Sequence, residues 1–270
     1  MAVWGVSMFK DEDDIAYHTL MHMAEEHLDG LIVADNLSTD DTRAELERAK
    51  QDLAGTCEVV IVEDREAAHY QGRKMTGLAG VAHGHGAEWI VPFDADELWY
   101  SREGPLGDVL ETLAPDVWVA SAQVWNHFTT DLDKTEGRVT FESMVYRYPS
   151  PSDLPKVAVR WAPDMRIAMG NHGATFGAAS RPDLPGRLEL RHFPYRSVEQ
   201  FVRKVLNGAS AVDATDLPES ECCHWREYGA IYDRSGEPAL RSVYHTQMHF
   251  PEPISAGLVL DPAPFRHWSR

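Results

Sequence analysis

The first 93 residues alternate short apolar runs with segments whose apolar residues recur at helical spacing. The apolar runs occupy residues 3–9, 30–35, 57–64 and 87–93. Each is short and nearly uninterrupted, as in strands of a parallel sheet that is buried on both faces. The segments between them, residues 17–28, 43–53 and 71–86, have the apolar periodicity of helices. Three successive β–α steps predict a doubly wound, mostly parallel sheet with right-handed crossovers.

Several local signals predict how these helices begin and which face they bury. Ser38 and Asp41 have the spacing of a capping box ahead of the helix at 43–53. In the helix at 71–86, the apolar periodicity places Leu78, Val81 and Ala82 toward the core.

The pattern loosens after Tyr100. Residues 105–113 read as a helix, whereas residues 117–125, 138–148, 156–162 and 188–193 read as strands of a mixed sheet. A clear helix follows at 196–208, with a capping box at Ser197 and Gln200 and with Gly208 as its C-terminal cap. Its first turn lies next to His192, Tyr195 and Arg196 and is a candidate anion seat. We therefore expect an α/β domain over residues 1–210, with an irregular or helical extension at 211–270 packed on it.

The charge distribution restricts the partners. The net charge of −18 disfavours nucleic acid and anionic lipid. Residues 141–210 are the exception, with 10 Lys and Arg against 6 Asp and Glu. This basic segment fits a small phosphorylated ligand, although uneven surface charge explains it equally well. No apolar run reaches the roughly 18 residues needed to cross a bilayer, and three cysteines form no even framework. We expect a cytoplasmic protein with no transmembrane segment.

The stretch WIVPFDADELWY, residues 89–100, runs from an apolar strand into Asp94, Asp96 and Glu97. In an open parallel sheet, ligands bind beyond the carboxyl ends of the strands. Three carboxylates at such a place repel one another unless a cation neutralises them, and oxygen ligands select Mg²⁺ or Mn²⁺. Bound Mg²⁺ usually keeps open positions for substrate phosphates. The alternative is an ordinary Asp-x-Asp surface turn.

The segments GVSMFKDE, IVADNLSTDDT and QGRKMTGLAGVAHGHGAEWIVPFDADE, in this order, resemble the family 2 glycosyltransferases, which have the GT-A fold. The likeness covers roughly residues 1–100. Where that family has two acidic residues followed by Gly-Ser-Thr-Asp, this chain reads Asp-Asn-Leu-Ser-Thr-Asp at 35–40. The later segment LELRHFPYRSVEQFVRKVLNG looks like a bacterial subgroup with a histidine before the final helix. The resemblance implies metal-dependent, inverting transfer from a nucleotide-sugar donor to a glycan, lipid-linked or small-molecule acceptor.

The resemblance also implies roles for individual residues. Asp94, Asp96 and His192 are the expected ligands of Mn²⁺ or Mg²⁺, and Glu97 would support them. Asp35, Asn36, Asp40, Arg73, Lys74 and Asp94 would bind the donor. Four cations are candidates for neutralising its diphosphate: Lys156, Arg160, Arg196 and Lys204. Inversion needs a base for the acceptor proton, for which we favour His172 and then Glu142, with Asp131 and Asp133 also open.

Other functions remain as alternatives. An Asp-x-Asp after a strand also occurs in phosphohydrolases of the haloacid-dehalogenase type, where the first Asp is the nucleophile. A non-catalytic protein that binds carbohydrates or nucleotide sugars would retain the same fold. A zinc site built on CCHW at 222–225 with His245 and His249 is disfavoured, because adjacent cysteines lack the usual ligand spacing. The sequence contains no G-x-G-x-x-G motif after a strand and no phosphate-binding G-K-[ST] loop.

Overall fold

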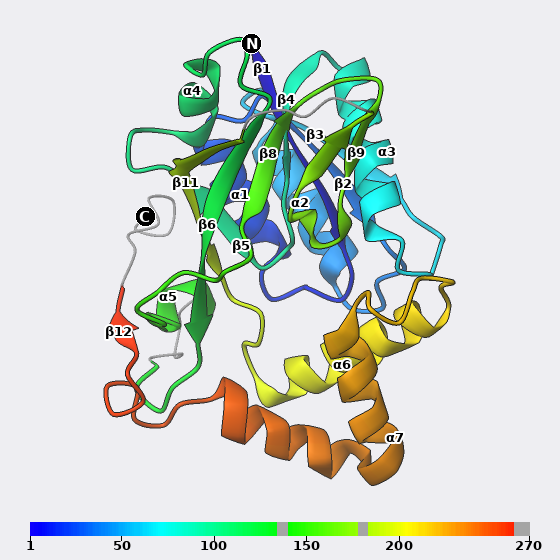
Figure 1. Cartoon of the computed structure of the whole chain (residues 1–270), viewed down its shortest axis with the longest axis vertical. Helices are drawn as coiled ribbons and strands as arrows, with labels where there is room; N and C mark the ends of the chain where they lie inside the picture. Colours follow the sequence, from blue (N-terminus) through cyan, green and yellow to red (C-terminus); the bar gives the residue numbers. More distant parts are fainter. Residues whose placement is uncertain (134–139, 178–182, 262–270) are drawn as a thin grey trace.

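The computed structural model describes residues 1–133, 140–177 and 183–261. Within them, ten strands form one sheet in the order β12-β7-β6-β8-β4-β1-β2-β3, with β11 paired to β6 and β5 (Figure 1). The strands are β1 Ala2–Phe9, β2 Gly30–Asp35, β3 Glu58–Glu63, β4 Ala87–Pro92, β5 Glu97–Tyr100, β6 Val119–Phe128, β7 Tyr146–Arg147, β8 Lys156–Arg160, β11 Asp183–His192 and β12 Val259–Leu260. A separate small hairpin pairs β9 Met165–Ile167 with β10 Ala174–Phe176.

The first half of the sheet is parallel and the second half is mixed. Strands β3, β2, β1 and β4 run parallel to one another. Strand β8 lies antiparallel between β4 and β6, and β11 is parallel to β6 but antiparallel to β5. This arrangement confirms the expected α/β class with a doubly wound, mostly parallel sheet.

Helices cover both faces of the parallel half, which explains why its strands are apolar throughout. Three helices pack on one face: α1 Ala16–Glu25, α2 Thr42–Asp52 and α4 Leu106–Glu111. Helix α3 Gln71–Gly84 and the β9–β10 hairpin cover the other. Alternate residues of one strand therefore enter different cores: Val3 packs with the first set of helices, whereas Trp4 packs with α3.

Three local predictions were wrong. Val81 is 41% exposed, because α3 buries Leu78 and Ala82 while Val81 lies at the solvent edge of that face. Helix α2 is capped from Asp40, whose Oδ1 accepts from Thr42 N at 2.9 Å, whereas Ser38 Oγ accepts from the amide of Asp11. The strand expected at 138–148 is instead the one-turn helix α5 Thr140–Ser143 followed by the two residues of β7. Residues 138 and 139 lie outside the described part.

The C-terminal region is more helical than the sequence indicated. Helix α6 Val198–Asp213 begins as predicted at Ser197, whose Oγ accepts from Gln200 N at 3.1 Å. It continues through Gly208, so the predicted C-terminal cap there was wrong. Helix α7 Cys223–Val243 follows, with a break at Gly236, where φ is 71°. That glycine and Pro238 interrupt the helical pattern and explain the irregular appearance of the sequence.

The C-terminal extension packs on α6 and on the far edge of the sheet. Phe201 and Val205 of α6 form a small core with Leu240 and with Tyr244 of the π-helical turn η2 Tyr244–Met248. The chain then returns to pair β12 with β7. Because α6 spans Val198–Asp213, the expected boundary at residue 210 falls inside this helix. In Figure 1, α6 and α7 lie below the lower ends of the central strands. No helix in the described part of the chain is long and apolar enough to cross a membrane.

Two buried histidines, His22 and His127, should make the stability of the protein depend on pH. His22 Nε2 lies 2.6 Å from Trp99 O, and His127 Nδ1 lies 2.8 Å from Met144 O. Burial lowers the pKa of His22 to about 4 and that of His127 to about 3. Both are neutral in the folded protein but titrate near 6.5 once unfolded, so unfolding takes up protons below pH 6.5. We expect each to remove about 2 kcal/mol from the free energy of unfolding between pH 6.5 and pH 5.

Urea denaturation of wild type and of the double variant His22→Asn/His127→Asn at several pH values measures this effect. The variant should lose much less stability than wild type over that range. The exposed control His245→Asn should follow wild type. If the free energy of unfolding fell equally with pH in wild type and in the double variant, the two histidines would not be buried in their neutral form.

Candidate functional site

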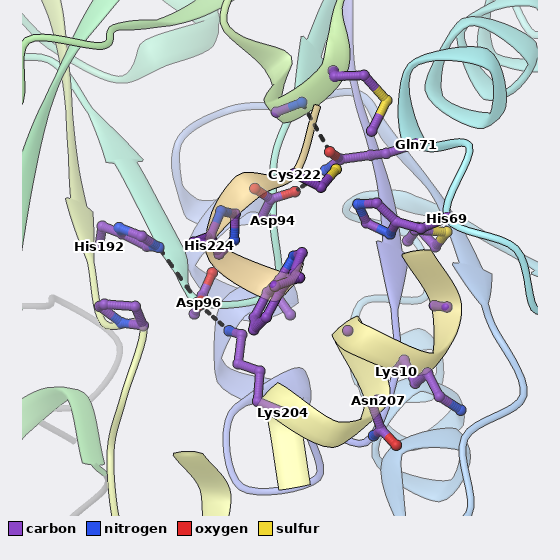
Figure 2. Close-up of a pocket in the computed structure, with 18 of the residues that line it drawn as sticks. Lys10, His69, Gln71, Asp94, Asp96, His192, Lys204, Asn207, Cys222 and His224 are labelled. Atoms are coloured by element: carbon purple, nitrogen blue, oxygen red, sulfur yellow. Dashed lines mark hydrogen bonds and ion pairs between the residues drawn. The ribbon is translucent and has the colours of Figure 1, made fainter. Parts of the chain in front are cut away.

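A pocket of about 530 Å³ opens beyond the carboxyl ends of β1, β2 and β4. The first half of the chain contributes Lys10, Asn36, Gln71, Asp94 and Asp96. Asn126 enters from β6 and Lys156 from β8. His192 enters from β11, Lys204 and Asn207 from α6, and Cys222 and His224 from the start of α7 (Figure 2). The pocket thus lies where an open parallel sheet binds ligands, and the C-terminal extension forms one wall.

Asp96 is held between two side chains from the second half of the chain. Its Oδ2 lies 2.5 Å from Lys204 Nζ and 3.6 Å from His192 Nε2, and Figure 2 shows it between them. His192 Nδ1 in turn lies 2.8 Å from Asn126 Oδ1. Burial raises the pKa of Asp96, but the charges of Lys204 and then His192 lower it by more. The pKa of Asp96 therefore lies well below its usual value. Asp96 is therefore an ionised carboxylate, although it is only 3% exposed.

Asp94 and Glu97 share the buried ammonium of Lys156. Lys156 Nζ lies 2.6 Å from Asp94 Oδ2 and 2.7 Å from Glu97 Oε1. Asp94 Oδ1 accepts further hydrogen bonds from Gln71 Nε2 at 2.9 Å and Asn171 Nδ2 at 3.2 Å. Burial raises the pKa of Glu97, and Lys156 lowers it only in part. The three carboxylates after β4 are thus divided between two lysines from distant segments.

A second row of charges anchors α6 to the loop after β1. Lys204 Nζ also lies 3.3 Å from Glu12 Oε1. Glu12 and Asp14 both accept from the buried guanidinium of Arg196. The result is a chain of alternating charge from Asp96 through Lys204, Glu12 and Arg196 to Asp14. Because Arg196 is fully engaged in this chain, it does not face the pocket.

His172 also lines the pocket and follows directly after the 3₁₀ turn η1 Met169–Asn171. Its Nδ1 lies 2.8 Å from Pro155 O, so Nδ1 carries the proton in the neutral ring and Nε2 keeps a lone pair. Burial lowers the pKa of His172, which favours that neutral form. The ring packs against Gly170, where a Cβ would come within 2.4 Å of it.

The structure brings half of the predicted site residues into this pocket. They are Asn36, Asp94, Asp96, Lys156, His172, His192 and Lys204. The other predicted residues do not line the pocket. They are Asp35, Asp40, Arg73, Lys74, Glu142, Arg160 and Arg196.

Most of the predicted residues outside the pocket make contacts elsewhere in the structure. Arg160 Nε donates to Val117 O at 2.7 Å, beyond the amino end of β4 and far from its carboxylates. Arg73 pairs with Glu66 on the surface, and Lys74 pairs with Asp64 at 2.6 Å. Asp35 Oδ1 accepts from the amide of Ser38 and so fixes the turn after β2. Glu142 lies on α5, which does not line the pocket.

Sequence reasoning missed several residues of the site, namely Lys10, Glu12, Gln71, Asn126, Asn207 and the 221–225 segment. Glu12 follows the end of the strand predicted at 3–9, and Gln71 begins the helix predicted at 71–86. The rule that ligands bind beyond strand ends could therefore have pointed to both. Asn126 and the 221–225 segment carry no local signal, because long-range packing brings them to the pocket.

The expected metal site is not preformed. No group of three or more His, Cys, Asp or Glu side chains within residues 1–133, 140–177 and 183–261 is arranged to hold a metal ion. Asp94 directs both oxygens at hydrogen-bond donors, and Oδ2 of Asp96 accepts from Lys204. Asp96 and His192 do lie together as predicted, but the described residues do not fit a metal bound by Asp94, Asp96 and His192.

Comparisons with known proteins give weak likenesses. No family model matches the chain, and no curated protein matches it. Among solved structures, residues 1–349 of S. aureus TarS align with 92% of this chain and 73% of theirs, at 11% identity and a TM-score of 0.43. Glucosyl-3-phosphoglycerate synthase from Mycobacterium tuberculosis, solved with Mn²⁺, UDP and glucosyl-3-phosphoglycerate, aligns with 46% of this chain and 44% of its own, at 17% identity and a TM-score of 0.30. At these values neither structure supports an argument about this chain.

The shared ammonium of Lys156 leads to a stability prediction. Lys156→Met leaves Asp94 and Glu97 without their cation, and breaking a buried pair in this way typically costs about 3–5 kcal/mol. The double variant Lys156→Met/Glu97→Gln should recover part of that loss, because it also removes one of the two charges. Urea denaturation measures both, with the exposed Lys50→Met as a control that should stay within about 0.5 kcal/mol of wild type. A loss below about 1 kcal/mol for Lys156→Met would contradict the assigned pairing.

Proposed function

We propose that this protein transfers a glycosyl group from a nucleotide sugar to an acceptor hydroxyl. The observation that carries the proposal is the ionised Asp96, set between Lys204 and His192 at the end of β4 and facing a pocket of about 530 Å³. That volume lies within the range of about 300–1,000 Å³ typical of small-ligand sites. Paired charges at the strand ends fit a diphosphate and sugar hydroxyls better than an apolar ligand.

The donor is expected to bind across the strand ends, with its nucleoside toward Asn36 and its sugar toward Asp94 and Asp96. Asn36 lines the pocket and is fixed by hydrogen bonds from its Nδ2 to Asp64 Oδ2 and Glu66 O, both at 2.8 Å. Lys10 enters beside it, held by Leu37 O at 2.8 Å. A base site built from such short, fixed polar groups provides specificity without rearrangement.

The transfer is a single displacement that inverts the anomeric carbon. The acceptor oxygen forms a bond to that carbon, the bond from the carbon to the diphosphate oxygen breaks, and the nucleoside diphosphate leaves with the electron pair. The acceptor proton goes to a base, for which we propose Nε2 of His172. Its Nδ1 donates to Pro155 O and its pKa is lowered, so the neutral ring keeps a lone pair on Nε2, and the residue lines the pocket.

The expected activity can be tested with a panel of nucleotide sugars. We expect at least one of them to raise the melting temperature and to release its nucleoside diphosphate, slowly with water and faster with an acceptor. The panel starts with UDP-sugars and GDP-sugars. Release of inorganic phosphate from simple phosphate esters would instead indicate a phosphohydrolase, and binding without turnover would indicate a non-catalytic binding protein.

Variants of the site make the test specific. His172→Gln should lower the transfer rate about 10²- to 10⁴-fold, as expected for loss of a general base, while donor affinity stays within a few fold. Asp96→Asn should lower both donor binding and transfer. Asp108→Asn, an exposed carboxylate beside His27, is the matched control and should keep full activity. Full transfer activity in His172→Gln would reject His172 as the base without rejecting the transferase.

A further inference from the structure

We propose that the ammonium of Lys204 supplies the positive charge at Asp96 that a divalent metal was expected to supply, so that the donor diphosphate binds and departs without a metal ion. This inference rests on the proposed transferase function. It assigns a catalytic role to a lysine on the C-terminal helix α6, outside the segment that carries the Asp-x-Asp motif.

Lys204 is placed where a diphosphate would meet the acidic end of β4. Its Nζ contacts Asp96 Oδ2 at 2.5 Å and Glu12 Oε1 at 3.3 Å, and its side chain lines the pocket (Figure 2). An ammonium has three N–H donors, of which Asp96 accepts one, while Glu12 lies within ion-pair distance of the group. The side chain keeps 22% of its surface exposed. One N–H is therefore available to a phosphate oxygen in the pocket.

The surroundings hold Lys204 in this position from both sides. Asp96 is itself fixed beside His192, and Glu12 is fixed by the buried Arg196. Helix α6 starts about two turns earlier at its Ser197 cap and packs through Phe201 and Val205 against the C-terminal core. Backbone and partners together position the ammonium before any ligand arrives, as a preorganised electrostatic site requires.

A divalent cation would compete poorly for the same place. A cation bound to Asp96 Oδ2 would lie within a few ångströms of the Lys204 ammonium and be repelled by it. Asp94, the other expected carboxylate ligand, directs its two oxygens at Lys156, Gln71 and Asn171. Metal binding would thus require breaking ion pairs around both carboxylates.

The chemical consequence concerns the leaving group. As the bond between the sugar carbon and the diphosphate oxygen breaks, negative charge grows on the departing nucleoside diphosphate. A further N–H of Lys204 would donate to one of its phosphate oxygens and stabilise that charge, while the acceptor proton goes to the base. No proton or electron is needed from Lys204, which stays charged throughout.

Binding of nucleoside diphosphates by wild type tests the inference without any variant. Isothermal titration with UDP, GDP, ADP and inorganic pyrophosphate is done once in EDTA and once in MnCl₂. We expect the affinity of the best probe to change less than about 2-fold between the two conditions, and we expect no saturable Mn²⁺ binding in the absence of nucleotide. A loss of affinity of about 10-fold or more in EDTA would overturn the inference.

Substitution of Lys204 provides the second arm. In EDTA, Lys204→Met should weaken binding of that probe about 10- to 100-fold, the usual effect of losing one charged hydrogen-bond donor. Lys204→Arg keeps the charge and should stay within about 10-fold of wild type. Lys50→Met removes an exposed lysine elsewhere and should bind as wild type does. Circular dichroism confirms folding of each variant before titration.

The outcomes separate the two proposals. Wild-type affinity in Lys204→Met in EDTA would overturn the role of Lys204. Binding that appears only with Mn²⁺ would overturn it as well, yet leave the transferase proposal standing. Absence of binding for every nucleotide, nucleotide sugar and pyrophosphate, with and without Mn²⁺, would reject the transferase proposal itself.

Discussion

The neutralisation of three carboxylates at the end of β4 is the constraint around which the site is organised. Asp96 and Glu97 are buried and Asp94 is partly buried, so each requires a compensating charge. That compensation comes from Lys156 and Lys204, which lie on β8 and α6. An acidic motif in the first hundred residues therefore depends on the second half of the chain for its charge balance.

This dependence explains why the pocket is assembled from distant segments. The parallel strands supply the carboxylates, and β6, β8 and β11 supply Asn126, Lys156 and His192. The C-terminal helices close one side with Lys204 and the 221–225 segment. A ligand that fills the pocket would therefore meet residues from both halves of the chain.

Local sequence patterns were sufficient for the parallel half of the fold and for the place of the site. Four apolar runs with helical segments between them predicted strands β1 to β4, and the strand-end rule pointed to Asp94 and Asp96. Local sequence patterns could not predict which side chains pair with those carboxylates. Nothing near Lys204 or Arg160 in the sequence distinguishes a lysine that reaches Asp96 from an arginine that stacks over Trp89. Such assignments depend on which strands become neighbours, a property of the whole chain.

The most direct measurement is a crystal structure of the protein grown with MnCl₂ and the nucleoside diphosphate that binds best. The account predicts a phosphate oxygen about 3 Å from Lys204 Nζ, with the contact between Lys204 and Asp96 retained and no anomalous manganese signal beside it. A manganese ion coordinated by Asp96 and His192, with Lys204 turned away from the phosphate, would contradict it.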